Sequence, residues 1–298
     1  MIDRVVLGTS QLMRQYGINN FEKDHNIEKA FKILNLACDF GVKSFDTSPI
    51  YEESEKILGK FFLKKNMKIE FTSKIISLTK TKFKDQKNFN IKTFVKHQLE
   101  NTLKNLKVDS IENYIIHDEN DYFFRSGEII EQLLKFKNIY FKNLGISIYS
   151  EEICSRVISE GYIDLIQVPY NLFDDRFISY INAAKIKKIK TQIRSIFLQG
   201  LIFMSKKNYL NKFKKDFEKI KYYRDFCNKH NIEIYKLPIL DSFKNPSISS
   251  IIIGADNFNQ CRKNLEFIAS LNQKKIKEKI NYKKINLSNE IINPEKWN

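Results

Sequence analysis

Short runs of β-branched and aromatic residues recur along the chain, and polar or amphipathic segments separate them. Runs of this length, bounded by polar residues, are typical of buried strands. We therefore expect eight strands, at RVVLG (4–8), VKSFD (42–46), KIEFTSK (68–74), ENYIIH (112–117), FKNLGIS (141–147), DLIQVPY (164–170), TQIRSIF (191–197) and SSIIIG (249–254).

Between these runs, apolar residues repeat at the spacing of a helix face. In IEKAFKILNLACDFG (27–41) the apolar positions include Ala30, Ile33, Leu34 and Ala37, and Gly41 suits the position just after a helix. Ser150 and Glu151 have the chemistry of a helix start. The same pattern predicts further helices over 52–65, 91–106, 150–161 and 257–270.

Strands that alternate with helices indicate a parallel sheet joined by right-handed crossovers. Eight such units close a (β/α)8 barrel, a TIM barrel, and 298 residues suit a single domain of that kind. An open doubly wound sheet is the alternative. It would normally carry G-x-G-x-x-G after its first strand, where this chain has LGTSQLMRQYG.

Two segments do not fit the repeating pattern. The stretch 201–223, after the seventh predicted strand, is long and basic, and we interpret it as a loop over the barrel mouth. The barrel is predicted to cover residues 1–270. Residues 271–298 form a lysine-rich C-terminal tail with little pattern, which we expect to be loosely attached.

The chain is strongly basic, with 51 Lys and Arg against 35 Asp and Glu, a formal charge of +16. Such a charge could attract nucleic acid or an anionic membrane. However, the lysines are scattered along polar helix faces and loops, so we expect neither partner. A milder consequence is that positive charge near the site helps to draw in an anionic cofactor or substrate.

The cysteines and the N-terminus bear on metal sites, disulfides and cellular location. Cys38, Cys154, Cys227 and Cys261 are far apart, so we expect reduced thiols, with no zinc site, no other metal and no disulfide framework. MIDRVVLGTS lacks the apolar core of a signal peptide, and no run approaches the ~20 apolar residues of a membrane helix. We therefore expect a cytoplasmic protein without a membrane anchor.

Four polar residues stand at or near the ends of three successive predicted strands. Asp46 ends the second strand, Lys74 the third and His117 the fourth, while Tyr51 follows Asp46 by five residues. In a barrel the C-terminal strand ends meet at one mouth, where active sites are built. We therefore expect these four side chains to meet.

Together they can protonate a carbonyl oxygen while a hydride attacks the carbon. A free tyrosine has a pKa of about 10, and a neighbouring ammonium such as that of Lys74 favours its phenolate. Asp46 could hold Lys74, and His117 could orient the carbonyl. Taken singly, each residue also has a structural interpretation, as a packed ring, a solvated lysine, a structural histidine or a helix cap. The occurrence of all four at or near successive strand ends favours a catalytic role.

The chain resembles the aldo-keto reductase family from about Val5 to Ala269. FDTSPIYEESEKILG is similar to the family's segment that carries its aspartate and tyrosine, FTSK to its lysine motif and DSIENYIIHDEN to its histidine segment. LGTSQLMRQYGINN is closer to a bacterial branch often associated with sugar and surface-polysaccharide pathways. The resemblance implies a metal-free (β/α)8 barrel that reduces carbonyls with NADPH, less often NADH.

The resemblance also implies a set of cofactor-binding residues. Ser147 and Gln167 match the residues that hold the nicotinamide carboxamide, and Arg194 stands where many members stack a tyrosine on the nicotinamide. Ile148 replaces a frequent asparagine, so one carboxamide hydrogen bond should be missing. The remaining matches are Gly8 and Thr9 after the first strand, and Phe197, Leu198, Gln199 and Gly200 in the loop that wraps the pyrophosphate.

The segment IIIGADNFNQCRKN resembles the family's site for the adenosine phosphate. A helix N-terminus there could bind an anion, although an ordinary polar helix start is the alternative. Asp256 stands where many members carry Arg or Ser, and its charge would repel a 2′-phosphate unless Arg262 or Lys263 points inward. NADPH is thus the expected cofactor and NADH the alternative. The matching residues are Gly254, Asn257, Gln260 and Asn264.

The leading hypothesis is an enzyme, an NAD(P)H-dependent oxidoreductase in which Tyr51 protonates an aldehyde or ketone, for example a sugar-like carbonyl. The alternative is a reductase-like barrel that binds cofactor as a non-catalytic or regulatory subunit. The partner is a small-molecule carbonyl substrate, and the sequence indicates neither its identity nor an oligomeric state. Candidates for the substrate side of the mouth are Ile50, Asp118, Tyr149 and Tyr170.

Overall fold

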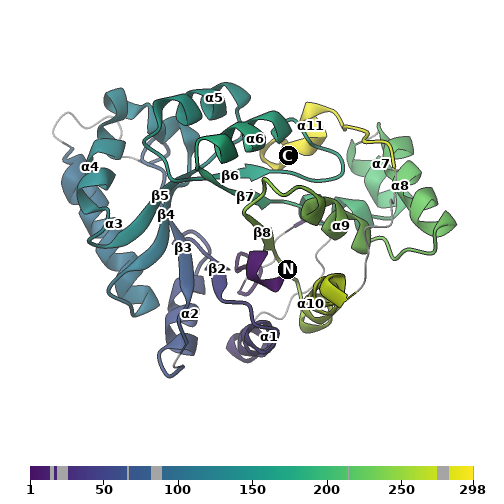
Figure 1. Ribbon diagram of the computed structural model, residues 1–298, viewed down its shortest axis with the longest axis horizontal. Helices are drawn as coiled ribbons and strands as arrows, with labels where there is room; N and C mark the ends of the chain where they lie inside the picture. The colour runs from purple at the N-terminus through teal and green to yellow at the C-terminus, as the bar shows by residue number, and fades with distance from the viewer. Residues whose placement is uncertain are drawn as a thin grey trace.

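The computed structural model describes residues 1–13, 17–18, 26–65, 67–81, 89–213, 215–273 and 282–297. Their backbone forms a closed barrel in which β1 to β8 follow one another in sequence order (Figure 1). The ring closes between β1 and β8, which are parallel and pair Val6 with Ile252. The predicted (β/α)8 barrel is confirmed. The strands are β1 (Val5–Gly8), β2 (Ser44–Asp46), β3 (Glu70–Ile75), β4 (Ile111–Ile116), β5 (Phe141–Ser147), β6 (Leu165–Pro169), β7 (Lys190–Arg194) and β8 (Ser250–Ile253).

The strands read as apolar runs because the barrel covers them on both faces. All residues of β1 and of β6 are buried, with one face toward the barrel interior and the other toward the surrounding helices. Every predicted strand is present, and its observed bounds lie within a few residues of those expected. The sequence signal is therefore strong for β1 and β6, and weaker for β7, whose buried positions include Thr191 and Gln192.

Helices surround the barrel, and Figure 1 shows them on its outer side. They are α1 (Ile27–Asp39), α2 (Ser54–Phe62), α3 (Ile91–Leu106), α4 (Glu128–Phe136), α5 (Glu151–Glu160), α6 (Ile178–Ile186), α7 (Lys206–Phe213), α8 (Phe217–Lys229), α9 (Lys236–Lys244), α10 (Phe258–Gln273) and α11 (Asn289–Ile292). Two short 3-10 helices matter for the site, η4 (Leu198–Phe203) and η5 (Pro294–Lys296).

The helix ends follow local chemistry that the sequence predicts. The Ser150 side chain accepts a hydrogen bond from the N–H of Ile153 at the start of α5. Gly161 ends that helix with φ of +77°, and Gly41 follows α1 with φ of +86°. The apolar face predicted for α1 is also correct, because Ala30, Ile33, Leu34 and Ala37 are buried.

The long basic segment after β7 is helical, so the expectation of a loop is wrong. It forms η4, α7 and α8, and Figure 1 shows α7 and α8 to one side of the strands. Their apolar residues, among them Tyr209, Phe217 and Ile220, build a second buried cluster outside the barrel. These side chains recur at helical spacing among the lysines, and a partner surface for them exists only in the folded chain.

That partner surface includes the C-terminal tail. Leu287, Ile291 and Ile292 are buried in the second cluster, and the Leu287 N–H donates to the carbonyl of Phe173 at 3.1 Å. Lys284 forms an ion pair with the largely buried Asp241 at 2.6 Å. The expectation of a loosely attached tail is therefore wrong for residues 282–297, while 274–281 lie outside the described residues. The division of the chain near residue 270 stays a prediction.

Two further expectations can be compared with the described residues. The four cysteines are free thiols, as expected, and Cys154, Cys227 and Cys261 are buried. None of the helices in the described ranges combines the length and the apolar character needed to cross a membrane. The motif LGTSQLMRQYGINN lies partly outside the described residues, since 14–16 and 19–20 are not among them.

Candidate active site

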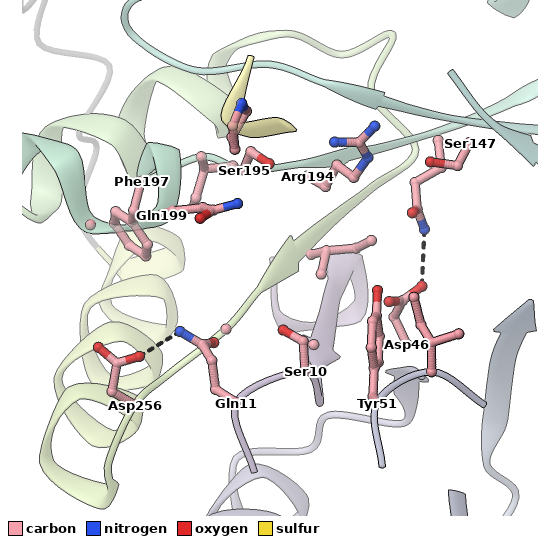
Figure 2. Close-up of a pocket in the computed structure, with 18 of the residues that line it drawn as sticks. Ser10, Gln11, Asp46, Tyr51, Ser147, Arg194, Ser195, Phe197, Gln199 and Asp256 are labelled. Carbon is pink, nitrogen blue, oxygen red and sulfur yellow. Dashed lines mark hydrogen bonds between the residues drawn. The ribbon is translucent and has the colours of Figure 1, made fainter. Parts of the chain in front are cut away.

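A cavity of about 820 Å³ opens at the C-terminal ends of the strands. Because the strands are parallel, these ends share one rim, and residues far apart in the sequence meet there. Figure 2 shows Asp46, Tyr51, Ser147 and Arg194 converging on this space. The strand ends contribute Gly8 from β1, Asp46 from β2, His117 after β4, Ser147 from β5, Gln167 from β6, Arg194 from β7 and Gly254 after β8.

Asp46 and Lys74 form a buried ion pair beneath the cavity. Lys74 Nζ lies 2.7 Å from Asp46 Oδ1 and also donates to the carbonyl of Thr47 at 2.7 Å. The ammonium is 5.0 Å from the centroid of the Tyr51 ring. Lys74 is the second-last residue of β3 and does not itself line the cavity. Its positive charge is thus fixed behind the tyrosine.

Tyr51 is positioned by the turn that precedes α2 rather than by the helix itself. Its N–H donates to the carbonyl of Ser48 at 2.9 Å, and its own carbonyl accepts from the N–H of Ser54 at 3.1 Å. The ring stands edge-on to His117, with centroids 6.2 Å apart. In Figure 2 its hydroxyl points into the cavity. The structure therefore brings Asp46, Tyr51, Lys74 and His117 together as the sequence predicts.

His117 is held as a neutral imidazole. Burial, together with the positive charges of Lys74, Arg194 and Lys80, lowers its pKa to about 3, while Asp118 acts in the opposite direction. Its Nδ1 lies 3.4 Å from the hydroxyl of Ser48. A neutral imidazole keeps one N–H donor and one acceptor, so His117 can donate a hydrogen bond without carrying a charge.

Gln167 links the ion pair to the next strands. Its Nε2 donates to Asp46 Oδ2 at 2.9 Å, which is the dashed line that ends on Asp46 in Figure 2. It also donates to Gln192 Oε1 at 2.7 Å. Both amide hydrogens are therefore used inside the protein. Only the Oε1 oxygen of Gln167 is left to accept from a ligand.

Most residues expected to contact the cofactor line the cavity. They are Gly8, Ser147, Gln167, Arg194, Phe197, Gln199, Gly200, Gly254, Gln260 and Asn264. Three do not. Thr9 is fully buried and donates to the Asp46 carbonyl at 2.9 Å, and Leu198 is buried in the second cluster. Asn257 accepts from the N–H of Gln260 at 3.0 Å and so caps the start of α10.

Ile148 and Arg194 both depart from the family's pattern near the expected nicotinamide position, and the structure places their side chains differently. Ile148 is completely buried in the core, so its side chain offers nothing to the cavity. Arg194 lines the cavity, and its guanidinium stacks 4.0 Å above the ring centroid of Tyr149. Its Nη2 lies 3.4 Å from the carbonyl of Ile148, and its buried Nε has no hydrogen-bond partner among the described residues.

At the other end of the cavity, Asp256 is bound to a residue that the sequence did not single out. Gln11 Nε2 donates to Asp256 Oδ1 at 2.5 Å, and Figure 2 shows the two side chains meeting across the groove. Lys263 lines the cavity, whereas Arg262 does not and lies 3.9 Å from Glu266. Asp256 thus faces the site with one cation of α10 nearby.

On the substrate side, Ile50, Asp118 and Tyr149 line the cavity as expected, but Tyr170 does not. Tyr170 is buried against the tail, with its hydroxyl 3.3 Å from Lys284 Nζ. The sequence missed several lining residues. Ser77 and Lys80 follow β3, so their place after a strand could have revealed them. Other lining residues carry no such signal: Phe203 of η4, Ile234 and Tyr235 between α8 and α9, and Pro294 of the tail.

The cavity has the size and lining of a small-molecule site. The described residues contain no group of three or more His, Cys, Asp and Glu side chains arranged to hold a metal ion. The cavity is within the usual ~300–1,000 Å³ of small-molecule sites. Its rim bears Gly254, where a Cβ would lie 2.0 Å from Gln11 Oε1 and would displace that side chain. Phe197, Gln199 and Gly200, at the start of η4, bound the same space.

Comparison with known proteins agrees with this geometry. The sequence model of the aldo/keto reductase family matches residues 4–281. Among solved structures, a Pseudomonas aeruginosa protein assigned to the aldo-keto reductases has 20% identity and a TM-score of 0.62, with 90% of each chain covered. The aldo-keto reductase AKR11C1 of Bacillus halodurans, in its holo form, has 17% identity and a TM-score of 0.71, covering 89% of this chain and 86% of that one. At such identities these structures inform on the fold. No curated protein matches the sequence.

Proposed function

Because the chain belongs to the aldo/keto reductase family, we propose that it is an NAD(P)H-dependent oxidoreductase in which Tyr51 protonates an aldehyde or ketone substrate. The observation that carries this proposal is the cluster of Tyr51, His117 and the buried pair Asp46–Lys74 at the barrel mouth. A protein that only bound a nucleotide would not need a buried ammonium behind a tyrosine.

The proton starts on the Tyr51 hydroxyl. A nicotinamide cofactor, when bound, would supply the hydride, and Tyr51 would give its proton to the carbonyl oxygen. Lys74, 5.0 Å from the ring, favours the phenolate that remains. Asp46 holds the ammonium in place at 2.7 Å. General acid catalysis of this kind contributes roughly 10²–10⁴-fold.

His117 orients the carbonyl in this mechanism. Its pKa of about 3 means that it is neutral at physiological pH. A hydroxyl of Ser48 that donates to Nδ1, 3.4 Å away, would leave the Nε2–H for the substrate oxygen. A neutral donor binds a carbonyl without competing with Tyr51 as the proton source.

The cofactor would lie along the cavity. Ser147 and the free Oε1 of Gln167 would hold the carboxamide, and the loop Phe197–Gly200 would bound the pyrophosphate. The segment from Gly254 to Asn264 would hold the adenosine end, where the Gln11–Asp256 bond supports a role in cofactor choice. NADPH is the proposed cofactor, with NADH as the alternative that Asp256 favours.

One observation favours a non-catalytic cofactor-binding or regulatory subunit as a second candidate. The Ile148 side chain is buried in the core and cannot replace the amide found there in relatives. Transfer of deuterium from 4-deuterated NADPH or NADH to a panel of aldehydes separates the two functions. The proposal expects the label on the product carbon. Cofactor binding without label transfer to any substrate would support the second candidate.

A further inference from the structure

We propose that the natural substrate of this site carries a carboxylate group, and that Arg194 binds it with the N–H edge of its guanidinium. This inference rests on the proposed carbonyl reduction, because it concerns the same cavity. It goes further in naming the chemical class of the substrate. The observation behind it is an uncompensated cation at the reacting end of the cavity.

The charges at this end of the cavity fall into pairs, with one left over. Asp46 is neutralised by Lys74 at 2.7 Å. Asp118 is neutralised by Lys80 at 2.9 Å. Arg194 is the remaining charged residue near Tyr51 and His117, and no ion pair joins it to a carboxylate of the described residues. A pocket with one unpaired positive charge favours an anionic ligand.

The guanidinium of Arg194 is held in a fixed orientation. One face stacks on Tyr149 at 4.0 Å, which sets the plane of the group. Along its edge, Nη2 makes only a long contact of 3.4 Å to the carbonyl of Ile148, and the buried Nε has no partner. A buried donor without a partner is costly, so the protein leaves part of the hydrogen-bonding capacity of this guanidinium unused.

A carboxylate of the protein does not take this role. Asp174 is close enough to Arg194 for the two charges to interact, but it is buried and pairs with Arg176 at 3.4 Å. Burial raises the pKa of Asp174 to about 6, and the charge that it carries at neutral pH is already paired with Arg176. Arg194 therefore keeps most of its charge available to the cavity.

The size of the excess charge favours a carboxylate over a phosphate. One unpaired guanidinium balances one negative charge and matches the two oxygens of a carboxylate. A phosphate monoester carries about −1.5 to −2 at neutral pH and would remain uncompensated. The charge of Arg194 reaches the reacting end, since it is among the causes that lower the pKa of His117. The face opposite Tyr149 can still contact a nicotinamide while the edge binds the substrate.

The test compares two probes of the same shape, 4-carboxybenzaldehyde and 4-carbamoylbenzaldehyde, at saturating cofactor. The ratio of their kcat/KM values removes any effect of a variant on the cofactor, which acts on both substrates alike. The parent should prefer the acid by about tenfold or more, in keeping with a charge-assisted contact. Arg194→Gln should bring the ratio close to one, and Arg194→Lys should leave an intermediate value.

The matched control is Lys263→Gln, which removes a cation from the other end of the same cavity and should leave the ratio unchanged. A second pair, glyceraldehyde 3-phosphate and glyceraldehyde, tests the alternative anion. A stronger preference for the phosphate than for the carboxylate would overturn the proposal. So would an acid-to-amide ratio near one in the parent, or one that Arg194→Gln does not change.

Calorimetry with the corresponding alcohols, 4-(hydroxymethyl)benzoate and 4-(hydroxymethyl)benzamide, needs no turnover. Tighter binding of the acid to the parent, lost in Arg194→Gln, would support the carboxylate site even if no aldehyde were reduced. That result would refute the proposed reaction alone. Turnover of aldehydes without any preference for acids would refute the carboxylate site alone.

Discussion

Lys74 and Asp46 form an ion pair of 2.7 Å whose side chains are only 1% and 6% exposed. Burying two charges has a large desolvation cost, and apolar residues in their place are often as stable or more so. A contribution to thermodynamic stability therefore does not explain why this chain has a buried ion pair here. A role in catalysis does explain it, because Lys74 Nζ lies 5.0 Å from the centroid of the Tyr51 ring.

The first prediction separates the contribution of this pair to folding from its contribution to catalysis. Lys74→Met leaves Asp46 buried without its partner, and we expect a loss of about 3–5 kcal/mol in the free energy of unfolding. The double variant Asp46→Asn, Lys74→Met should recover most of that stability, because no unpaired charge remains. Denaturant unfolding measures the stability. Activity should stay low in both variants, and recovery of turnover in the double variant would show that the charge is not needed.

The second prediction concerns Tyr51. Tyr51→Phe keeps the ring packed against His117 but removes the proton, so carbonyl reduction should fall by roughly 10²-fold or more. Cofactor affinity, measured by fluorescence titration, should stay within a few-fold of the parent. Tyr149→Phe is the control, since it alters another tyrosine of the cavity that the mechanism does not use as an acid. Turnover above a tenth of the parent would remove Tyr51 from its role.

The third prediction is that His117 does not titrate between pH 5 and 8. Its pKa is lowered to about 3 by burial and by neighbouring cations, so its neutral form persists throughout that range. Histidine NMR signals followed from pH 4 to 8 should include one, lost in His117→Ala, that does not shift. His117→Ala should also slow bulky ketones more than small, reactive aldehydes. An inflection of the assigned signal near pH 6.5 would contradict the neutral assignment.

The fourth prediction addresses cofactor choice. Asp256 lines the cavity and accepts a hydrogen bond from Gln11 at 2.5 Å. Asp256→Arg should raise NADPH affinity about tenfold or more by a charge-assisted contact of roughly 1.5–3 kcal/mol. NADH affinity should change little. Gln11→Ala is the companion variant, because it breaks the same hydrogen bond without changing the charge.

Paired fluorescence titrations, one with each cofactor, measure this effect on the parent and on both variants. Unchanged affinities in Asp256→Arg would transfer the choice to Gln260 or Lys263, which line the same end. A parent that already prefers NADPH strongly would show that Asp256 is no obstacle to the 2′-phosphate.

The fifth prediction is a dependence of stability on pH. Burial raises the pKa of Asp174 from an ordinary 3.8 to about 6, so folding favours its protonated form. Asp174 therefore contributes stability that is present below about pH 4 and is lost as the pH rises through 6. Asp174→Asn does not titrate, and its stability relative to the parent should improve over that range by up to roughly 3 kcal/mol.

The loss of the contact with Arg176 shifts the stability of Asp174→Asn equally at every pH, so the comparison uses the slope with pH. Thermal unfolding at pH 4, 6 and 8 gives that slope. Asp225→Asn, on the exposed side of α8, should follow the parent at all three values. A stability difference between Asp174→Asn and the parent that is the same at pH 4 and 8 would contradict the prediction.

The sequence alone determined the barrel and the cluster at its mouth. Strands covered on both faces are rich in apolar and β-branched residues, so β1, β4, β6 and β8 are visible as apolar runs and the others by their spacing between helices. A parallel barrel brings its C-terminal strand ends together, so polar residues at the ends of β2, β3 and β4 must meet. Asp46, Lys74 and His117 could be placed on that basis, and Tyr51 by its distance from Asp46. The caps at Ser150 and Gly161 follow from local chemistry in the same way.

The tertiary structure decided what depends on contacts between distant segments. The apolar side chains of α7 and α8 are buried only because the tail, with Leu287 and Ile291, packs against them. No local pattern shows that Gln11 reaches Asp256 or that Tyr149 covers Arg194. Local sequence fixes the backbone geometry of each element and which face is apolar. Whether a charge is paired, buried or left for a ligand depends on neighbours that only the folded chain supplies.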